Sequence, residues 1–494
     1  MMTTRLILTV LCVGILGCTS AAASAESGKP LPEREKYLLL DSRVVAETDN
    51  ARLAVGTVKK HPQNPVMAKE HPWEHNFNNM YPNIIYDQDD KLYKLWYPTS
   101  LKPGRLRAAG LAEVADDDPD SRIKRATPPT GYADELAKKL DIDEGRISLK
   151  VGGRECICYA VSKDGLEWEK PLMNFFTYEG KPTHIVAEDN LGVGVFKDPG
   201  DPDPRRRYKM LTMPGLTVAF SPDGKHWSKY IRAAIPSNPQ ADCHNNAMWD
   251  PILKKYVCIT RGWPGGQRVA LRTESEDFIN WTKPVEVLRD RRDSHQLYDM
   301  CIFRHAGVYL AQLDLLDTKE FVHVSLAWSP DGVKWEHIDP ETPLIPRGKK
   351  EDSYDYGCVY CADDPIICDD EIRLYYCGSI RDHSWRDSTL CLATLRPDGW
   401  AGYVPKDPSS PAVVITEPVK CNGKTLRVTA DVEKGGSVKA SLLDQDGKEL
   451  IAGKTITTNV TAAPGADVAK LQGQAVRVKF EIDKAKVYSL AFGE

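Results

Sequence analysis

Short apolar runs recur along most of the chain, and each is followed by a turn and a second run rich in aromatic residues. In the first such pair, residues 83–87 (NIIYD) lead through a polar turn into residues 92–96 (LYKLW). Comparable pairs begin near residues 193, 247, 301 and 366. Apolar runs bounded by turn residues and enriched in aromatic and β-branched side chains indicate strands, so each pair predicts two adjacent antiparallel strands.

A second motif, SxDGxxW, follows these pairs at residues 162–168, 221–227 and 329–335. Degenerate copies stand at residues 275–281 and 396–400, so the motif recurs five times. Successive tryptophans lie roughly 55 to 65 residues apart, which leaves room for about four strands with their turns. The DG pair supplies the positive φ that a tight turn needs. The repeat therefore predicts an all-β fold, a five-bladed β-propeller over residues 26–404.

Two further segments depart from the repeat. Residues 101–153 form a charged insertion in the first blade and include a helical stretch at residues 132–140, which we expect to be either a rim over the propeller axis or a solvated loop. After a linker rich in proline and serine, apolar positions alternate at Leu426, Val428 and Ala430. Residues 412–494 are therefore predicted to form a small C-terminal β-sandwich.

Composition narrows the range of functions. The chain has 65 basic and 70 acidic residues, a formal net charge of −5. Because there is no basic excess to neutralise phosphates or anionic lipids, nucleic acid is not an expected partner and neither is a polybasic membrane contact.

The N-terminus reads as an export signal. Arg5 precedes an apolar run at residues 6–16, and small residues follow up to Ala25. The run is too short to span a bilayer, so residues 1–25 are predicted to be a signal peptide and the mature chain to be secreted or periplasmic, with no transmembrane segment. An alternative is a lipoprotein signal in which Cys18 is acylated and anchors the chain to a membrane.

Candidate chemistry lies at the segments that precede the first strand of each blade, because these segments converge in a propeller. Each carries a carboxylate, and aromatic, amide and imidazole side chains accompany it. Carboxylates gathered in one cavity acquire different pKa values, as an acid and base pair for glycosidic bond cleavage requires. The carboxylates are Glu74, Asp189, Asp242, Asp299 and Asp355, and the side chains expected to contact a sugar are Trp73, Asn79, Tyr81, His244, Asn245, Tyr298 and Tyr354.

A metal site is an alternative use of the same residues. His244 could join Asp242 as a ligand, but the repeat places no second histidine near them except His295. Three or four ligands are usual for a bound transition metal, so we predict neither a metal nor another cofactor.

The repeats, the leader at residues 64–67 that runs into Trp73 and Glu74, and the trailing sandwich resemble the five-bladed propeller glycoside hydrolases of families 32 and 43, especially exported family-32-like proteins. The resemblance covers roughly residues 37–494. By position it implies that Glu74 is the nucleophile or base, Asp189 a pKa-tuning acid and Asp242 the general acid.

The sequence departs from that pattern in each blade concerned. Asn79 stands where an aspartate is expected, the second blade has no Arg-Asp-Pro, and Asp242 replaces a glutamate before Cys243. Asp355 is a candidate replacement partner, so Asp242, Asp355 and Glu74 are the predicted catalytic carboxylates. The predicted function is an exported glycoside hydrolase acting on an oligo- or polysaccharide of plant, algal or microbial origin. The alternative is a carbohydrate-binding propeller without catalysis.

Overall fold

The computed structural model describes residues 31–100, 123–143, 146–148, 155–189, 192–213, 215–237, 239 and 241–494. The predicted signal peptide, the acylation candidate Cys18 and much of the insertion at residues 101–153 lie outside these ranges. Nearly all the described secondary structure is β-strand, in agreement with the all-β prediction. Among the described residues, no helix is long and apolar enough to cross a membrane.

Five successive antiparallel meanders, numbered I to V, account for most of the described residues 59–395. In each, three or four consecutive strands pair as neighbours. Meander I contains β5 (Asn83–Asp87), β6 (Leu92–Ser100), β9 (Glu155–Ser162) and β12 (Ile185–Asp189), and meander II contains β13 (Gly194–Lys197), β14 (Tyr208–Thr212), β15 (Thr217–Ser221) and β16 (Tyr230–Arg232), with β8 (Ile147–Ser148) on its edge.

The later meanders follow the same order. Meander III contains β17 (Asn246–Asp250), β18 (Lys255–Gly262), β19 (Val269–Ser275) and β20 (Val285–Leu288), and meander IV contains β21 (His295–His305), β22 (Val308–Asp317), β23 (Val322–Ser329) and β24 (Glu336–Ile338). Meander V contains β25 (Cys358–Cys361), β26 (Ile366–Ile367), β27 (Ile372–Ser379) and β28 (Thr389–Leu395). The early strand β4 (Lys59–Lys60) pairs with β28 and so completes the last meander with an N-terminal segment.

Hydrogen bonds connect the meanders in a cycle. Near the first strands, each meander bonds to the next through a polar side chain, and meander V bonds back to meander I. The five bonds run from Val195 N to Asn83 Oδ1, from Asn245 Nδ2 to the Gly192 carbonyl, from Ile302 N to Asn246 Oδ1, from Cys361 N to Asp314 Oδ1 and from Ile84 N to Asp363 Oδ1, at 2.7 to 3.0 Å.

The SxDGxxW motif forms the turn after the third strand of each meander, as predicted from its composition. In the intact copies the serine hydroxyl accepts a hydrogen bond from the glycine N–H, at 2.8 to 2.9 Å. Gly165, Gly224 and Gly332 have φ of 78°, 78° and 72°. In the degenerate copy at residues 275–281, Phe278 takes the glycine position with φ of 69°, and in the copy at residues 396–400 Asp398, which precedes Gly399, has φ of 61°. The left-handed turn is therefore kept in the copy that lacks the glycine.

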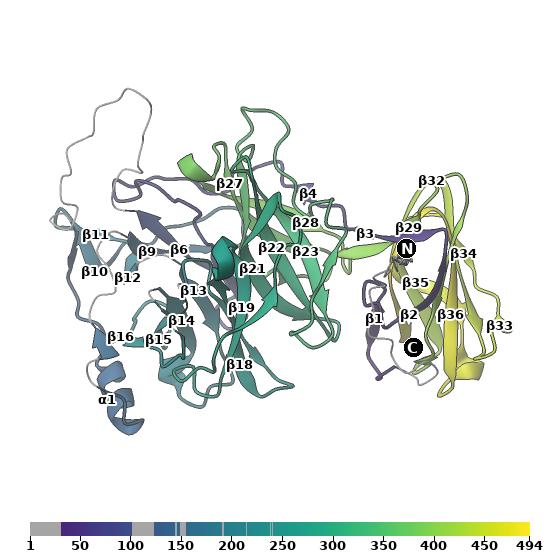
Figure 1. Cartoon of the computed structure of the whole chain (residues 1–494), viewed down its shortest axis with the longest axis horizontal. Helices are drawn as coiled ribbons and strands as arrows, with labels where there is room; N and C mark the ends of the chain where they lie inside the picture. Colours follow the sequence, from purple (N-terminus) through teal and green to yellow (C-terminus); the bar gives the residue numbers. More distant parts are fainter. Residues whose placement is uncertain are drawn as a thin grey trace, which may run out of the picture.

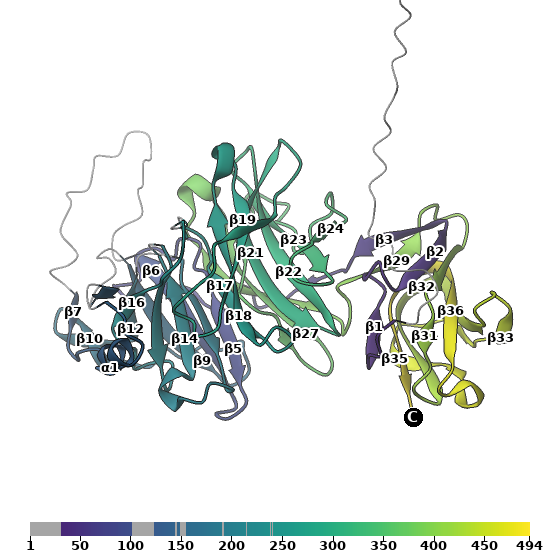
Figure 2. The same cartoon turned by 60° about the horizontal axis from the view of Figure 1, so that its bottom comes forward.

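The helix predicted in the insertion is α1 (Tyr132–Lys139). Its buried residues Tyr132, Ala133 and Leu136 pack in one cluster with Val218 and Phe220 of β15. Tyr132 also donates a hydrogen bond to Asp203, in the connection from β13 to β14. That connection lies at the end of meander II opposite the start of its first strand, so α1 does not cover the starting ends of the first strands. Figures 1 and 2 both place α1 at the margin of the molecule, beside β16 and away from β21.

Three short strands from the insertion and from residues 173–183 form a separate sheet. These are β7 (Ile123–Arg125), β10 (Met173–Tyr178) and β11 (Lys181–Thr183). Four 3-10 turns complete the described elements of the chain: η3 (Pro204–Arg206), η4 (Pro264–Gly266), η5 (His383–Trp385) and η6 (Ala469–Leu471).

The C-terminal strands form one sheet with the first strands of the chain. β1 (Lys36–Leu38) pairs with β36 (Ala475–Gly493), β2 (Val45–Asp49) with β30 (Ala412–Thr416), and β3 (Ala51–Val55) with β29 (Ala401–Pro405). The sheet also holds β31 (Val419–Lys420), β32 (Thr425–Leu443), β33 (Glu449–Ile451), β34 (Thr455–Ile456) and β35 (Val460–Asp467). The sequence predicts residues 36–55 to be part of the propeller. In the structure they pair instead with strands of this C-terminal sheet, on the right of Figure 1.

Candidate active site

Three of the seven residues predicted to contact a sugar gather with two of the candidate carboxylates in one cluster, which we call the Arg261 cluster. It comprises Asn79, Tyr81, Asp242, Arg261, Tyr298, Asp299 and Arg386. Asp242 lies just before β17, and Tyr298 and Asp299 lie within β21. Arg261 lies near the end of β18, the strand paired with β17, so the two strands bring a cation to the carboxylate that precedes the first strand.

Asp242 is the solvent-exposed carboxylate of this cluster. Its side chain is 53% exposed, and its Oδ2 lies 2.8 Å from a terminal nitrogen of Arg261. The Arg261 side chain is only 4% exposed, and its guanidinium lies over the ring of Tyr298, 4.9 Å from the centroid. A buried arginine with an aromatic ring on one side presents its charge in a fixed direction, so Asp242 is held as a carboxylate at the surface of the cluster.

Asp299 is the buried carboxylate. One oxygen, Oδ1, accepts a hydrogen bond from the backbone N–H of His244 at 2.8 Å. The other oxygen, Oδ2, has no hydrogen-bond partner among the described residues. The pairing of β21 with β22 shifts register between Leu297 and Asp299, so Tyr298 is the extra residue of a bulge. Bulges of this kind change the direction of a side chain and are common beside active sites.

The two carboxyl groups differ in protonation because their surroundings differ. Burial raises the pKa of Asp299 to about 7, against the opposing effect of Arg261, and the negative charge of Asp242 adds to the increase. A carboxyl group with a pKa of about 7 is protonated in about half of the molecules at pH 7. Asp242 instead forms an ion pair with Arg261. Two acids whose environments separate them in this way can serve as a general acid and a base or nucleophile.

A small cavity borders Asp299. It is lined by His244, Thr260, Arg261, Tyr298 and Asp299, among others, and its volume is about 10 Å³. That is the space of about one water molecule. A sugar ring therefore reaches Asp299 only if the side chains around the cavity move.

Two tyrosines and an asparagine surround the carboxyl groups. The amide nitrogen of Asn79 donates to the hydroxyl oxygens of Tyr81 at 2.7 Å and of Tyr298 at 3.0 Å, and Arg386 donates to the amide oxygen of Asn79. Burial raises the pKa of the Tyr81 hydroxyl well above its usual value, and the charge on Asp299 adds to the increase. Tyr81 therefore stays a neutral hydrogen-bonding group at physiological pH.

The segment that carries Asn79 has unusual backbone geometry. Asn78, Met80 and Tyr81 have φ of 51°, 61° and 34°. Positive φ in a residue as bulky as methionine or tyrosine is costly, and such residues cluster at ligand and active sites. Here the strained backbone turns Asn79 and Tyr81 toward Tyr298.

His244 and Asn245 support the loop that carries Asp242. His244 Nε2 lies 3.2 Å from Asn83 Oδ1, and burial lowers the pKa of His244 to about 3, so its ring is neutral. Asn245 donates from its amide nitrogen to the carbonyl oxygens of Gly192, Ala241 and Cys243. Both side chains are buried and face protein groups, so they position Asp242 and Asp299 rather than a ligand.

Glu74 lies in a different environment, which we call the Glu74 cluster: Glu74, Tyr97, Lys170 and His184. The carboxylate accepts hydrogen bonds from the backbone N–H groups of Glu70 and His71 and from the hydroxyl of Tyr97, at 2.7 to 3.0 Å. Lys170 Nζ lies 3.1 Å away and His184 Nε2 lies 3.3 Å away. Every side of this carboxylate thus faces a donor or a cation.

The partners of Glu74 decide its charge. Burial alone raises its pKa, but the hydrogen bond from His184 and the charge of Lys170 outweigh burial and lower the pKa of Glu74 to about 2. Burial also disfavours the cationic form of His184, yet Cys158 and Glu74 together raise the pKa of His184 to about 9. Trp73 packs beside this cluster, stacked on His71 at 4.6 Å between ring centroids.

Asp355 and Tyr354 lie against meander V. Lys60 of β4 forms an ion pair with Asp355, and Tyr376 of β27 donates to the same carboxylate at 3.0 Å. The hydroxyl of Tyr354 accepts from the side chain of Asn64 at 3.1 Å. These partners come from β27 in meander V and from the N-terminal segment that completes that meander. The structure thus does not bring Asp355 together with Asp242, and a catalytic role for Asp355 stays a prediction.

Asp189 ends β12, the last strand of meander I, where its backbone faces Glu155 of β9. Its side chain lies outside the described part of the structure.

Sequence reasoning missed the cations of the site. Arg261 and Arg386 lie outside the segments that precede the first strands, where the candidate residues were sought. Arg261 follows a buried apolar run in β18 and is itself buried. A charged residue at the end of a buried apolar run indicates a site with an oppositely charged partner, since buried charges are retained only when they are paired. Within the described ranges, no three or more His, Cys, Asp or Glu side chains are grouped as metal ligands.

Comparison with known proteins gives similarities at the level of solved structures. No protein-family model matches the chain, and no curated protein does. An α-L-arabinofuranosidase from Podospora anserina is 12% identical, with a TM-score of 0.45 over 69% of this chain and 96% of that one. A β-1,2-mannobiose phosphorylase from Listeria innocua is 15% identical, with a TM-score of 0.45 over 69% and 96%.

The catalytic domain of a family 62 α-L-arabinofuranosidase from Coprinopsis cinerea is 11% identical, with a TM-score of 0.46 over 69% of this chain and 97% of that one. Similarities of this degree do not transfer a function. We therefore infer function from the residues of this chain.

Proposed function

We propose that meanders I to V are the blades of a five-bladed β-propeller and that the C-terminal strands form a β-sandwich. The cycle of hydrogen bonds that returns from Asp363 to Ile84 supports closure of the ring. The pairing of β4 with β28 supports it independently, because a strand from the start of the chain completes the last blade. In such a ring the starting ends of the first strands meet at one mouth.

We further propose that the protein is a glycoside hydrolase and that the Arg261 cluster is its active site. Protonated Asp299 donates its proton to the glycosidic oxygen, and the bond from that oxygen to the anomeric carbon breaks. The carboxylate of Asp242 either attacks the anomeric carbon or removes a proton from a water whose oxygen bonds to that carbon. After attack by Asp242, water cleaves the glycosyl–Asp242 ester and gives its proton back to Asp299. Arg261 then balances the charge left on Asp299, and Tyr81 and Tyr298 supply aromatic and hydrogen-bonding surface for the sugar.

The unequal environment of Asp242 and Asp299 around a single arginine is the observation that carries this proposal. Asp299 has a free oxygen and a pKa of about 7, and Asp242 is half-exposed and ion-paired at 2.8 Å. An ion pair that only stabilises the fold does not require a neutral carboxyl group beside it. Acid–base catalysis does, because it uses one protonated and one ionised carboxyl group.

A second candidate function is carbohydrate binding without catalysis. It is favoured by the burial of Asp299, which is 3% exposed, and by the adjoining cavity of only about 10 Å³. In that case Asp242 and Arg261 would bind sugar hydroxyl groups at the surface. Asp299 would be a buried structural residue that holds the backbone at His244.

The test is a hydrolysis screen on a panel of plant, algal and microbial glycans, with the wild-type chain and the variants Asp242→Asn and Asp299→Asn. We expect each variant to lose at least about 100-fold in kcat/KM. Asp369→Asn is the control, because Asp369 is exposed in the turn before β27. Glycan binding by the wild-type chain without hydrolysis of any member of the panel would favour the second candidate.

We also propose that the protein is exported, by cleavage after Ala25 or by acylation of Cys18. Mass spectrometry of the mature protein from its native cells distinguishes the two. A mature chain that begins at Glu26 indicates a soluble secreted or periplasmic protein, and one that begins at a lipid-modified Cys18 indicates a membrane-anchored one.

A further inference from the structure

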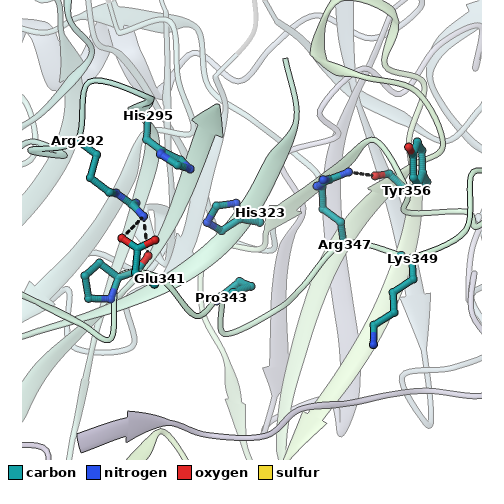
Figure 3. A pocket seen from close by; sticks show the side chains of 10 residues that line it. Arg292, His295, His323, Glu341, Pro343, Arg347, Lys349 and Tyr356 are labelled. Carbon is teal, nitrogen blue, oxygen red and sulfur yellow. Dashed lines mark hydrogen bonds and ion pairs between the residues drawn. The ribbon is translucent and has the colours of Figure 1, made fainter. Parts of the chain in front are cut away.

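A second pocket, larger than the cavity at Asp299, lies at the starting end of meander IV. Its volume is about 430 Å³. Arg292, His295 and His323 line it from one side, and the segment before β25 contributes Arg347, Lys349 and Tyr356 from the other. Figure 3 shows the two imidazole rings side by side between Arg292 and Arg347. The volume lies in the range of small-molecule sites.

Positive charge in this pocket is only partly balanced. Arg292 is ion-paired with buried Asp290 at 2.7 Å and reaches Glu341 at 3.5 Å. Arg347 instead donates to the carbonyl oxygen of Tyr356 and lies over the ring of Phe321, 4.1 Å from its centroid.

Within the described ranges, neither Arg347 nor Lys349 has a carboxylate at ion-pair distance. A guanidinium fixed by one carbonyl and one ring keeps its other N–H groups for a ligand.

The histidines add hydrogen-bonding groups without adding charge. Their rings lie 5.6 Å apart and are nearly perpendicular. Burial, followed by the neighbouring His295 and Arg292, lowers the pKa of His323 to about 4. Burial likewise lowers the pKa of His295. Both rings are therefore neutral at physiological pH and can each donate one N–H.

The pocket and the Arg261 cluster both involve residues of β21. His295 begins β21, and Asp299 lies four residues further along the same strand. At the rise of an extended strand this is roughly 13 Å. Arg268 connects the two regions, since it donates to Gln296 at 2.6 Å and lies over the ring of Tyr298 at 5.4 Å. A ligand of a few sugar units could therefore occupy both places.

We propose that this pocket binds the anionic group of an acidic saccharide, either the carboxylate of a uronic acid or a sulfate ester. Arg347 provides guanidinium donors that match a carboxylate or sulfate, and Lys349 lines the same pocket as a second cation, whereas the fork of Arg292 is already bound to Asp290. Tyr356, Pro340 and Pro343 provide the flat apolar walls that a sugar ring packs against. This inference rests on the proposed function for its substrate, and it narrows that substrate to an acidic glycan. Binding to the pocket itself can be tested separately.

The test is isothermal titration calorimetry of the wild-type chain with glucuronate, glucose 6-sulfate, glucose and inorganic sulfate. We expect glucuronate or glucose 6-sulfate to bind at least tenfold more tightly than glucose, and the stronger of the two identifies the anionic group. Inorganic sulfate should bind more weakly than the preferred sugar, because it lacks contact with the apolar walls. Equal binding of glucose and both acidic sugars would overturn the proposal, as would sulfate binding as tight as that of the sugars.

Variants locate the binding. Arg347→Gln should weaken binding of the preferred sugar at least tenfold. Arg304→Gln is the matched control, because Arg304, like Arg347, lies over an aromatic ring but at the far end of β21, and it should leave binding within twofold. An unchanged affinity in Arg347→Gln would place the sugar elsewhere and overturn the proposal.

Asp242→Asn separates the two proposals. It should leave glucuronate binding intact. Loss of hydrolysis with retained glucuronate binding in Asp242→Asn would support both proposals. Glucuronate binding by a wild-type chain that hydrolyses no glycan of the panel would refute the proposed hydrolase and still support the pocket.

Discussion

Glu74 and Asp299 are both buried carboxyl groups that the sequence identifies as candidate site residues. Their surroundings shift their pKa values in opposite directions. Glu74 accepts from two backbone N–H groups and a tyrosine hydroxyl and faces Lys170 and His184, and its pKa falls to about 2. Asp299 accepts from one backbone N–H, has a free oxygen, and its pKa rises to about 7.

The number of donors, rather than burial, separates these two carboxyl groups. Satisfied on all sides, Glu74 stabilises the fold as an ion and has no lone pair left for a substrate. Asp299 keeps a proton and an unused oxygen at a cost in stability. Asp299 is a buried carboxyl group with one oxygen that makes no hydrogen bond, and it lies beside an exposed carboxylate and a fixed arginine. It is therefore a better candidate for a catalytic residue than Glu74.

The largest expected effect comes from removing the cation of the Arg261 cluster. Arg261→Met should lower kcat/KM on a cleaved glycan at least about 100-fold, because Asp242 loses its partner and the charge left on Asp299 is no longer balanced. Since Arg261 lowers the pKa of Asp299, its loss should also move the alkaline limb of the pH–rate profile from near pH 7 to higher pH. Lys170→Met is the matched control in the Glu74 cluster and should leave kcat/KM of the folded enzyme within a few-fold. An equal loss in both variants would remove the distinction between the clusters.

Next in size is the stability effect of Glu74→Gln, expected to be about 3 kcal/mol at pH 7, because Lys170 and His184 lose their counter-charge. The folded-state pKa of Glu74 lies below its unfolded value, so its contribution is present above about pH 4.5 and is lost as the pH falls toward 2. Urea unfolding of both proteins should give curves that differ most at pH 5 to 7 and converge on acidification. If the activity of the folded variant fell 100-fold instead, Glu74 would belong to the reaction.

The sequence predicts the strands, the turns and the gathering of carboxylates near the Arg261 cluster, but it does not predict the surroundings of Glu74. Apolar runs bounded by turn residues predicted the strands and SxDGxxW predicted the turns, because turn chemistry is local. The structure places Asp242, Tyr298 and Asp299 around Arg261, at the starts of first strands that the repeat identifies. The ion pairs of Glu74 and Asp355 could not be predicted, because their partners Lys170 and Lys60 come from distant segments. Pairing of residues 36–55 with the C-terminal sheet is likewise a long-range contact without a local signal.

Stability should also depend on pH through Asp299. Its folded-state pKa is raised above the unfolded value, so the proton stabilises the fold at low pH, and stability falls as the pH rises from about 4 to about 7. Between pH 5 and 8 this amounts to about 2 to 3 kcal/mol. Asp299→Asn carries no charge at either pH and should lose this dependence, which thermal unfolding at the two pH values measures. A wild-type and variant pair with parallel pH profiles would mean that Asp299 ionises normally and is no general acid.

The smallest effect is expected for Asp355→Asn. Lys60 is part-exposed and can turn to water, and Tyr376 can still donate to the amide oxygen, so we expect a loss of about 1 to 2 kcal/mol in urea unfolding. Activity per folded molecule should stay within twofold, because this ion pair belongs to meander V and its N-terminal strand. Lys60→Met should give a similar loss, and the double variant should lose less than the sum of the two, since both remove the same pair. A folded Asp355→Asn protein with activity reduced 100-fold would return Asp355 to the catalytic set and would show that a saturated carboxylate can still serve the reaction.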